Sequence, residues 1–246
     1  ELPTDPAAET ALDALLARHA HEIAAVIVEP LVQGARGMKM HGAHTLRALR
    51  ALCDRHGLLL IFDEIFTGFG RTGAMFAFEQ AGATPDILCL SKALSGGMAP
   101  LAATLARRPI AAAFEADHPA AVLMHGPTFM ANPLACAAAN ASLDLFEREP
   151  RLDQVAAIEA QLRIGLEPCR DLPGVVDVRV MGAIGVVELD GDSESLRHAF
   201  PPLGVWVRPF GRIVYLTPPL VIGADDLARL TDAVVAVVGN WAKGRP

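Results

Sequence analysis

The sequence LLLIFDE at residues 58–64, followed by ILCLSK at residues 87–92, decides the fold of this chain. Each stretch opens with four or five consecutive apolar residues and then changes to polar or charged ones. Short, continuous apolar runs are typical of strands that are buried on both faces of a parallel sheet. The two stretches are about 30 residues apart, the size of one β-α-β unit. The pattern predicts two parallel strands of one sheet.

The flanking sequence extends this pattern on both sides. The spacing of leucines predicts helices at residues 9–20 and 44–56, with Gly57 ending the second helix, and another apolar run occupies residues 23–28. A fourth strand is expected at residues 101–105. Strands that alternate with helices indicate an α/β fold, in which helices cover both faces of a mostly parallel sheet.

The pattern changes in the second half of the chain, where helices are followed by short strands. We expect a boundary near residue 150, with residues 1–150 in a large α/β domain and residues 151–246 in a smaller α+β domain. The elements expected here are helices at residues 108–117, 133–148, 152–168 and 224–239, and strands at residues 175–180, 184–189, 204–208 and 212–216.

The composition is that of an ordinary globular protein. Acidic residues outnumber basic ones by 28 to 21, and no basic stripe is present, so no nucleic-acid partner is expected. No apolar run approaches the ~18 residues of a membrane span, and the acidic start has no signal-peptide pattern. We expect a cytoplasmic protein without a membrane partner. Because the chain does not begin with Met, we expect its sequence to begin inside a longer protein.

The cysteines do not form a recognisable site. Cys53, Cys89, Cys136 and Cys169 are far apart and include no C-x-x-C pair. A zinc site needs clustered ligands, and a disulfide framework is typical of small secreted chains. We expect reduced thiols and no bound metal.

Three expected strands end at ionisable side chains: Glu29, Asp63 and Lys92. In open α/β sheets, ligands bind beyond the carboxyl ends of the parallel strands. If the last two strands are neighbours or near neighbours, Asp63 and Lys92 bring a carboxylate and an amine to one crevice.

An amine and a carboxylate in one crevice suit pyridoxal phosphate, which needs a lysine for its resting Schiff base and an acid beside its pyridine nitrogen. Once displaced by a substrate amine, the lysine can move a proton. Spacing alone leaves open a second interpretation, in which Lys92 reaches solvent and Asp63 caps a turn. Glu64 is expected to face away from Asp63, in a cap or salt bridge, and Glu29 is expected to be structural.

The glycine-rich stretch GFGRTG at residues 68–73 matches the G-x-G-x-x-G fingerprint of dinucleotide-binding proteins. Adjacent acids at Asp63 and Glu64 precede it and would repel a pyrophosphate. No clear amphipathic helix begins at the glycines, and the next strand ends in Ser91 and Lys92 rather than in an acid. These features argue against an NAD-dependent dehydrogenase. A P-loop motif is not found either.

Several strings together resemble the class III aminotransferases of the fold-type I pyridoxal-phosphate group. They are VEP at residues 28–30, DEI at 63–65 with GFGRTG at 68–73, and SKALSGG at 91–97. The resemblance implies that the chain contains part of the large cofactor domain and the small C-terminal domain. Two further stretches, HGPTFMANP at 125–133 and WVRPFG at 206–211, resemble the branch that works in biotin synthesis. There, S-adenosylmethionine donates an amino group to 8-amino-7-oxononanoate.

The resemblance also implies roles for individual residues. Lys92 matches the Schiff-base lysine and Asp63 the partner of the pyridine nitrogen. Gly126, Pro127 and Thr128 match a segment that lies at the cofactor of the opposite subunit, with Thr128 on the phosphate, so a homodimer with shared sites is implied.

Arg208 matches the residue that holds the carboxylate of the oxo acid, a task that suits the two-pronged guanidinium. Lys92, Gly126 and Arg208 would thus line the substrate. Arg36 and Ser95 depart from the family's usual residues, away from the proposed chemistry.

The N-terminal half of the family carries a Gly-Ser turn for the cofactor phosphate and aromatic residues for the ring and the substrate, and these are not present here. We therefore expect weak cofactor binding and negligible turnover from this chain alone. Two alternatives remain: another class III aminotransferase that acts on an ω-amino acid or diamine, and a non-catalytic truncated subunit that pairs with a complete one.

Overall fold

The computed structural model describes residues 2–115 and 117–244, and the chain divides into two compact units. The first unit consists of residues 1–33, 40–69 and 76–149, and the second of residues 34–39, 70–75 and 150–246. The main division therefore falls between residues 149 and 150, and two short loops from the first half of the sequence belong to the second unit.

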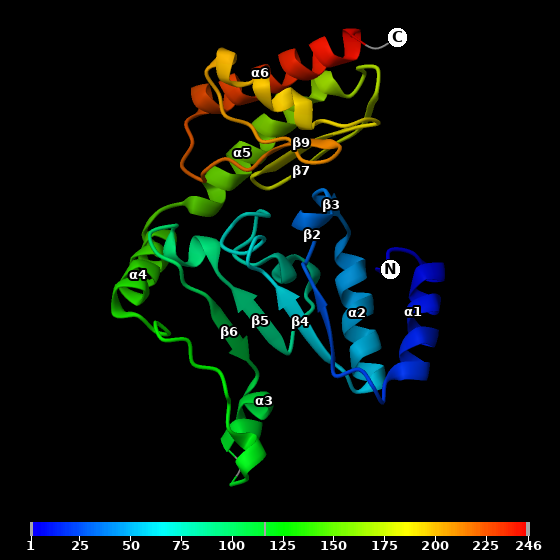
Figure 1. Ribbon diagram of the computed structural model, residues 1–246, viewed down its shortest axis with the longest axis vertical. Coiled ribbons are helices and arrows are strands. Elements are labelled where there is room, and N and C mark those ends of the chain that lie inside the picture. Colours follow the sequence, from blue (N-terminus) through cyan, green and yellow to red (C-terminus); the bar gives the residue numbers. More distant parts are fainter. Residues whose placement is uncertain (1, 116, 245–246) are drawn as a thin grey trace. The chain divides into compact units, whose positions relative to one another are not determined.

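The first unit is built on a four-stranded sheet with the order β1-β4-β5-β6 (Figure 1). Strands β1, β4 and β5 are parallel, and β6 is antiparallel to β5. The parallel sheet predicted from the apolar runs is confirmed. The strands are β1 (Ala25–Val28), β4 (Leu59–Asp63), β5 (Ile87–Leu90) and β6 (Ala103–Ala106), and the short strands β2 (Val32–Gln33) and β3 (Lys39–Met40) form a separate ribbon.

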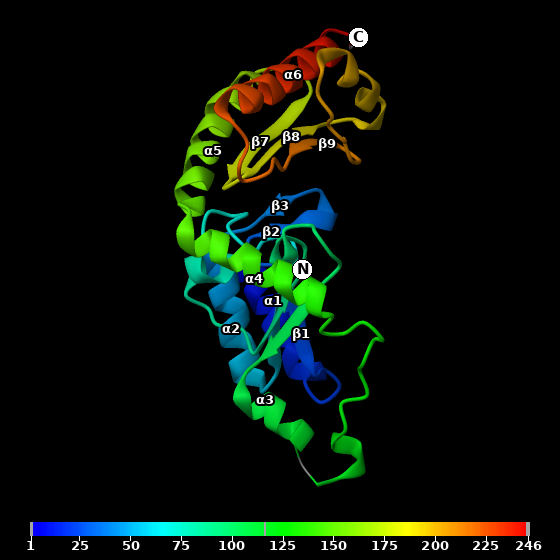
Figure 2. The same ribbon diagram turned by 90° about the vertical axis from the view of Figure 1, so that its left-hand side faces the viewer.

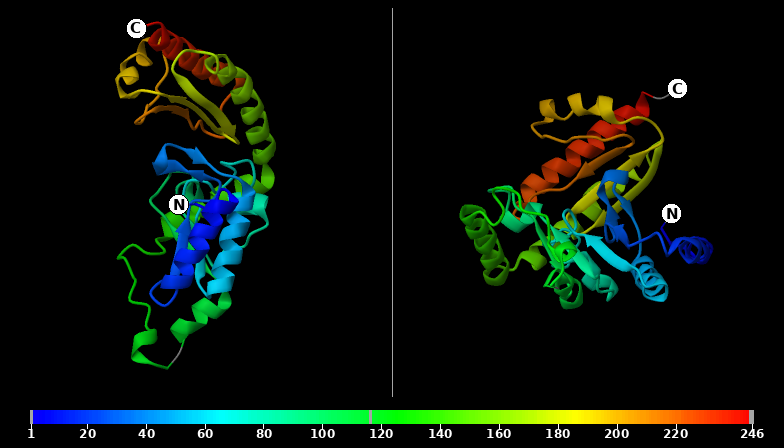
Figure 3. Two further views of the ribbon diagram at one scale, coloured as in Figure 1. Left: turned by 90° about the vertical axis from the view of Figure 1, so that its right-hand side faces the viewer. Right: turned by 60° about the horizontal axis from the view of Figure 1, so that its bottom comes forward.

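Helices α1 (Pro6–His19) and α2 (Ala43–His56) lie side by side (Figures 1 and 3), and α2 packs on β4. Leu46, Leu49 and Leu52 occur at helical intervals and are all buried, so one face of α2 supplies the core. The helix ends at Gly57, whose φ of 66° is accessible to glycine without a Cβ clash. Both helices agree with the sequence prediction within a few residues.

The two faces of the first sheet are not equally covered. Phe62 and Leu88 are buried, whereas their strand neighbours Ile61 and Ile87 are half-buried and Ile27 is 64% exposed. The expectation that both faces would be covered is therefore not met within the described residues, although the strands themselves are apolar on both faces.

The remaining elements of the first unit differ from prediction in two places. The expected fourth strand is antiparallel, because only twelve residues without a long helix connect β5 to β6, too little for the usual parallel crossover. The helix expected at 108–117 is shorter among the described residues, which exclude 116: α3 (Arg108–Ala112) continues as a 3₁₀ turn at residues 113–115. Helix α4 (Pro133–Arg148) begins as predicted, with the Asn132 side chain accepting hydrogen bonds at its first turn.

The second unit is a three-stranded antiparallel sheet, β7-β8-β9, with two long helices along one face (Figure 2). Its core lies between the helices and the sheet, and includes the fully buried Leu162, Val187 and Val238. The elements are α5 (Arg151–Leu166), β7 (Val175–Met181), β8 (Ile184–Leu189), β9 (Ile213–Leu216) and α6 (Ala224–Lys243).

Two half-buried arginines attach the short loops to this unit. Arg179 donates to the backbone carbonyls of Gly37 and Met38, and Arg71 donates to those of Ala183 and Pro218. Burial lowers the pKa of Arg71 to about 10. Both loops are thus held in the second unit by long side chains that donate to backbone carbonyls. The pattern of apolar residues in the sequence does not predict such contacts.

The strand predicted at residues 204–208 is not formed. The segment alternates exposed and buried residues, with Trp206 79% exposed and Val207 buried, but pairs with no neighbouring strand in the described residues. Pro209 follows and has no backbone N–H to donate to a ladder. No helix among the described residues is both long enough and apolar enough to span a bilayer.

Candidate active site

The structure brings Asp63 and Lys92 to the same edge of the first sheet. Asp63 is the last residue of β4 and lies opposite Cys89 of the neighbouring parallel strand β5, and Lys92 follows Cys89 by three residues. Asp63 is half-buried, and its Oδ1 accepts a hydrogen bond from the Ile65 amide at 3.0 Å. The two side chains therefore come from adjacent strand ends, as the spacing predicted.

Lys92 begins a tight 3₁₀ turn, η3 (Lys92–Ser95), with its backbone at a φ of 47°. This left-handed conformation is unfavourable for a residue with a Cβ, and such strain persists only where neighbouring contacts impose it. The Ser91 hydroxyl donates to Leu101 O at 2.7 Å, and the Ser142 hydroxyl of α4 donates to Ala93 O at 3.0 Å. Hydrogen bonds on both sides thus fix the turn that presents the exposed Lys92 side chain.

An aromatic ring that the sequence analysis did not single out lies beside the lysine. The Lys92 Nζ is 5.0 Å from the centroid of the Phe66 ring, within the range of a cation–π contact. Phe66 follows Asp63 by three residues in the loop after β4. Its position in the sequence could have suggested a place near the strand end, but not a contact with Lys92.

The predicted structural role of Glu64 is confirmed. Its side chain is fully buried and accepts hydrogen bonds from the Thr67 hydroxyl and from the backbone amides of Ala77 and Phe78. Burial raises the pKa of this carboxyl group, against the opposing effect of the three donors. Glu64 thereby links the end of β4 to the 3₁₀ helix η2 (Ala77–Ala81).

The glycine-rich stretch at residues 68–73 forms successive turns and not the start of a helix. The Gly68 amide donates to Glu64 O at 3.0 Å, and a Cβ on Gly68 would come within 2.9 Å of that oxygen. Gly68 therefore serves a close backbone approach within the loop. The local geometry agrees with the rejection of a dinucleotide-binding site.

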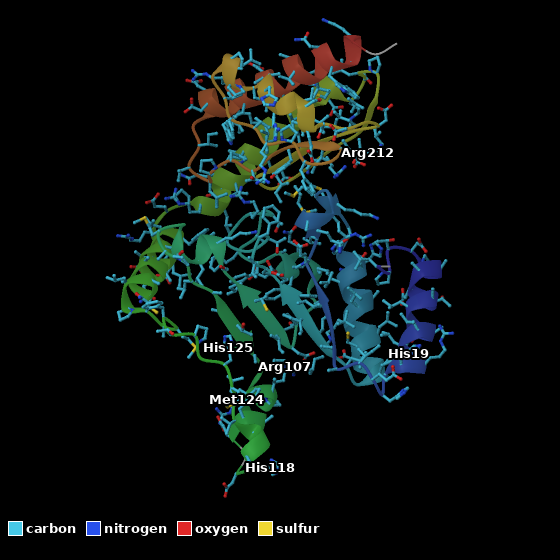
Figure 4. The ribbon with its side chains drawn as sticks, viewed as in Figure 1. His19, Arg107, His118, Met124, His125 and Arg212 are labelled. Carbon is cyan, nitrogen blue, oxygen red and sulfur yellow. The ribbon has the colours of Figure 1, made fainter. Side chains whose placement is uncertain are left out.

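The other residues predicted for the site belong to other segments of the chain. Gly126, Pro127 and Thr128 are exposed and belong to the irregular segment between α3 and α4, where Figure 4 labels the adjacent Met124 and His125. Arg208 belongs to the second unit and is exposed between buried neighbours. Glu29 follows β1, and its backbone carbonyl lies 3.1 Å from His41 Nε2.

The segment that contains Gly126 to Thr128 also exposes large apolar side chains. Met124 is 91% exposed, Phe129 79% and Met130 61%. Exposed apolar side chains gathered on one segment are typical of a surface that contacts protein.

Comparison with known proteins places the chain in a family. Residues 4–238 match the family described as aminotransferase class-III. The adenosylmethionine-8-amino-7-oxononanoate aminotransferase of Mycobacterium leprae is 50% identical over 96% of this chain and 54% of the relative. That of Corynebacterium glutamicum is 47% identical over 88% of this chain and 52% of the relative. The chain spans about half the length of the curated relatives it matches.

Solved structures agree with this result. The adenosylmethionine-8-amino-7-oxononanoate aminotransferase of Methanocaldococcus jannaschii aligns with a TM-score of 0.88 at 31% identity, over 95% of this chain and 57% of that one. An amine transaminase from an uncultivated Pseudomonas species, solved with pyridoxal phosphate bound, aligns with a TM-score of 0.89 at 37% identity, over 95% and 56%. From its sequence and its fold, this chain belongs to the class III aminotransferase family.

Proposed function

We propose that this chain forms part of an enzyme that transfers the amino group of S-adenosylmethionine to 8-amino-7-oxononanoate, giving 7,8-diaminononanoate for biotin synthesis. The observation that carries the proposal is the placement of Lys92 and Asp63 at the ends of adjacent parallel strands. The names of the relatives from Mycobacterium leprae and Corynebacterium glutamicum support this choice of substrates.

The residues at the strand ends fit pyridoxal phosphate, the cofactor of class III aminotransferases. When bound, the cofactor supplies an electron-withdrawing ring that stabilises negative charge at the substrate carbon. Lys92 supplies the amine that holds the cofactor and, once displaced, carries a proton as general base and acid. Asp63 holds a proton on the ring nitrogen as its charge partner.

The remaining roles belong to a partner copy of the chain and to residues 150–246 of this chain. Gly126, Pro127 and Thr128 would approach the cofactor of a partner copy, where backbone N–H groups and the Thr128 hydroxyl can bind phosphate oxygens. Their exposure leaves them available for such contacts. Arg208 would bind the carboxylate of the oxo acid. We propose a homodimer with shared sites, acting in the cytoplasm.

The test supplies the portion of the enzyme that this chain does not span. A chimera would join the N-terminal portion of the Mycobacterium leprae relative to residues 1–246. We expect it to bind pyridoxal phosphate and form 7,8-diaminononanoate, measured by mass spectrometry, whereas residues 1–246 alone should bind the cofactor weakly and show negligible turnover.

Lys92→Ala in the chimera should abolish both turnover and the absorbance of the cofactor bonded to lysine. Lys39→Ala, which removes an exposed lysine of the other unit, is the matched control and should preserve both. Persistence of the absorbance in Lys92→Ala would show that Lys92 is not the anchor. Strong turnover by residues 1–246 alone would contradict the proposed incompleteness.

A second candidate is transamination of an ω-amino acid or diamine. An (S)-enantioselective omega-transaminase from Thermomicrobium roseum aligns with a TM-score of 0.88 at 32% identity. Supplying the chimera with S-adenosylmethionine, lysine or pyruvate-linked amines separates the two, since only the first candidate requires S-adenosylmethionine. A non-catalytic subunit would give no turnover with any donor.

A further inference from the structure

Phe66 and Lys92 meet at the carboxyl edge of the first sheet, although they come from loops after different strands. Phe66 lies in the loop after β4 and Lys92 in the turn after β5, with Nζ 5.0 Å from the ring centroid. Phe66 is half-buried and Lys92 is exposed, so the ring is the more enclosed member of the pair.

The position of the Phe66 ring follows from the buried carboxylate of Glu64. The Thr67 hydroxyl donates to Glu64 Oε2 at 3.0 Å and the Gly68 amide donates to Glu64 O at 3.0 Å, so the chain closes a tight turn around residue 66. On the other side, the Ile65 amide donates to Asp63 Oδ1. Hydrogen bonds to the residues on both sides of Phe66 hold the backbone that carries the ring.

The lysine reaches this ring from a turn that is also held. Leu94 N donates to Ser91 O at 3.0 Å, and Ser142 on α4 donates to Ala93 O. Two independently fixed loops therefore place one aromatic face and one amine together. A ring face attracts a compact ammonium group through its quadrupole, and attracts less strongly a nitrogen whose charge is shared with a conjugated ring.

We propose that Phe66 is a positioning residue that holds the free ammonium of Lys92 after a substrate amine has displaced it from the cofactor. The inference rests on the proposed function and adds a residue to it. A cation–π contact at an exposed site favours the held ammonium by about two- to fivefold. Phe66 thus shifts the competition for the cofactor toward the substrate amine and keeps the lysine beside the site.

The contact itself is tested on residues 1–246, independently of any activity. Reductive methylation with ¹³C-formaldehyde converts each lysine amine to a dimethylammonium, which keeps the charge. The lysines are Lys39, Lys92 and Lys243, and the exposed Lys39 and Lys243 serve as internal references. We expect the methyl resonance of Lys92 to lie upfield of the other two, because protons over a ring face are shielded.

Phe66→Leu should move the Lys92 resonance to the position of the references, and Phe66→Tyr, which keeps a ring, should restore the upfield shift. Phe114→Leu removes a half-exposed ring elsewhere in the same unit and should change nothing. If the methyl resonances of the three lysines coincide in the unsubstituted chain, the proposal is overturned, whatever the variants show.

The consequence for the reaction is tested in the chimera. Phe66→Leu should raise the KM for the amino donor by about two- to fivefold with little change in kcat, and Phe66→Tyr should restore it. An unchanged KM in Phe66→Leu overturns the role of Phe66 even when Lys92→Ala behaves as expected. Survival of the lysine-bonded absorbance in Lys92→Ala instead overturns the proposed function, so the two failures are distinguishable.

Discussion

Glu64 and Asp63 are adjacent in sequence and have opposite tasks. The Glu64 carboxylate lies inside the loop after β4, where three donors surround it, and Asp63 ends the strand at the sheet edge. The two neighbouring acids therefore differ in role because the donors of the loop enclose one of them and the other ends the strand. That part of the candidate site could be predicted from sequence. The Phe66 contact could not, because the path of its loop depends on the long-range bonds of Glu64.

Glu64→Gln should destabilise the first unit by about 1–3 kcal/mol, because the amide NH2 would face a backbone N–H, whereas both oxygens of the carboxyl group can accept, protonated or not. The folded-state pKa of Glu64 lies above its ordinary value of 4.5, so the folded protein binds the proton more tightly than the unfolded one. The stability that proton binding by Glu64 contributes is fully present below pH ~4.5, and it declines as the pH rises through the folded-state pKa.

The difference in unfolding free energy between wild type and Glu64→Gln should therefore be larger at pH 5 than at pH 7.5. Amide hydrogen exchange of β4 and β5 at the two pH values measures this difference in unfolding free energy. A difference that grows with rising pH would contradict the assigned direction.

Arg208 can be tested at the same scale, in the chimera. Arg208→Ala removes a charged, two-pronged partner of a carboxylate, and we expect about a 10- to 100-fold loss in kcat/KM for the oxo acid. The donor, by contrast, should be little affected. Arg229→Ala removes an exposed arginine of the same unit and is the matched control. Equal losses in kcat/KM for the donor and the oxo acid would contradict the proposed role of Arg208 in binding the carboxylate.

At the scale of elements, Asp86 joins three parts of the first unit. Its carboxylate accepts hydrogen bonds from Arg50 on α2, from the Leu60 amide on β4, and from Arg107 after β6, which Figure 4 labels. Burial acts to raise the pKa of Asp86, but the Leu60 amide and the two guanidinium groups together hold it below its ordinary value.

A depressed folded-state pKa means that the contribution of Asp86 is present above its unfolded value of about 3.8–3.9 and is lost as the pH falls through the folded-state value. Asp86→Asn should destabilise the first unit by about 1–3 kcal/mol at pH 7 and by less near pH 3. Urea unfolding followed by circular dichroism at both pH values checks this. Asp54→Asn, which affects a more exposed partner of Arg50, should have a smaller effect.

Elements with a strong apolar pattern could be predicted from sequence. Strand direction and strand pairing, which depend on the connections and neighbours of a strand, could not. The leucines of α2 and the apolar runs of β4 and β5 encode their structures locally. The antiparallel direction of β6 depends on the length of the preceding connection, and the segment at 204–208 looks like a strand but lacks a partner. Pairing is a property of the tertiary structure, so a short apolar run does not determine it.

At the scale of the whole molecule, the aromatic residues make the two units distinguishable. Trp206, Trp241 and Tyr215 all belong to the second unit, and the first contains neither tryptophan nor tyrosine. Leu162→Ala, at a fully buried position of α5, should destabilise this unit by about 2–5 kcal/mol.

Tryptophan fluorescence during urea unfolding measures the effect. Leu152→Ala on the same helix, where the side chain is 40% exposed, should cost much less. Equal effects at the two positions would contradict the assigned core. The assignment of residues 34–39 and 70–75 to the second unit was not predictable, because it depends on single arginines and not on an apolar pattern.

The φ of 47° at Lys92 has a consequence for how this gene would change over time. A glycine at position 92 would adopt the same backbone with no Cβ to crowd the carbonyl, and would relieve about 1–2 kcal/mol. In a descendant released from selection on chemistry, drift toward glycine would be favoured by stability alone.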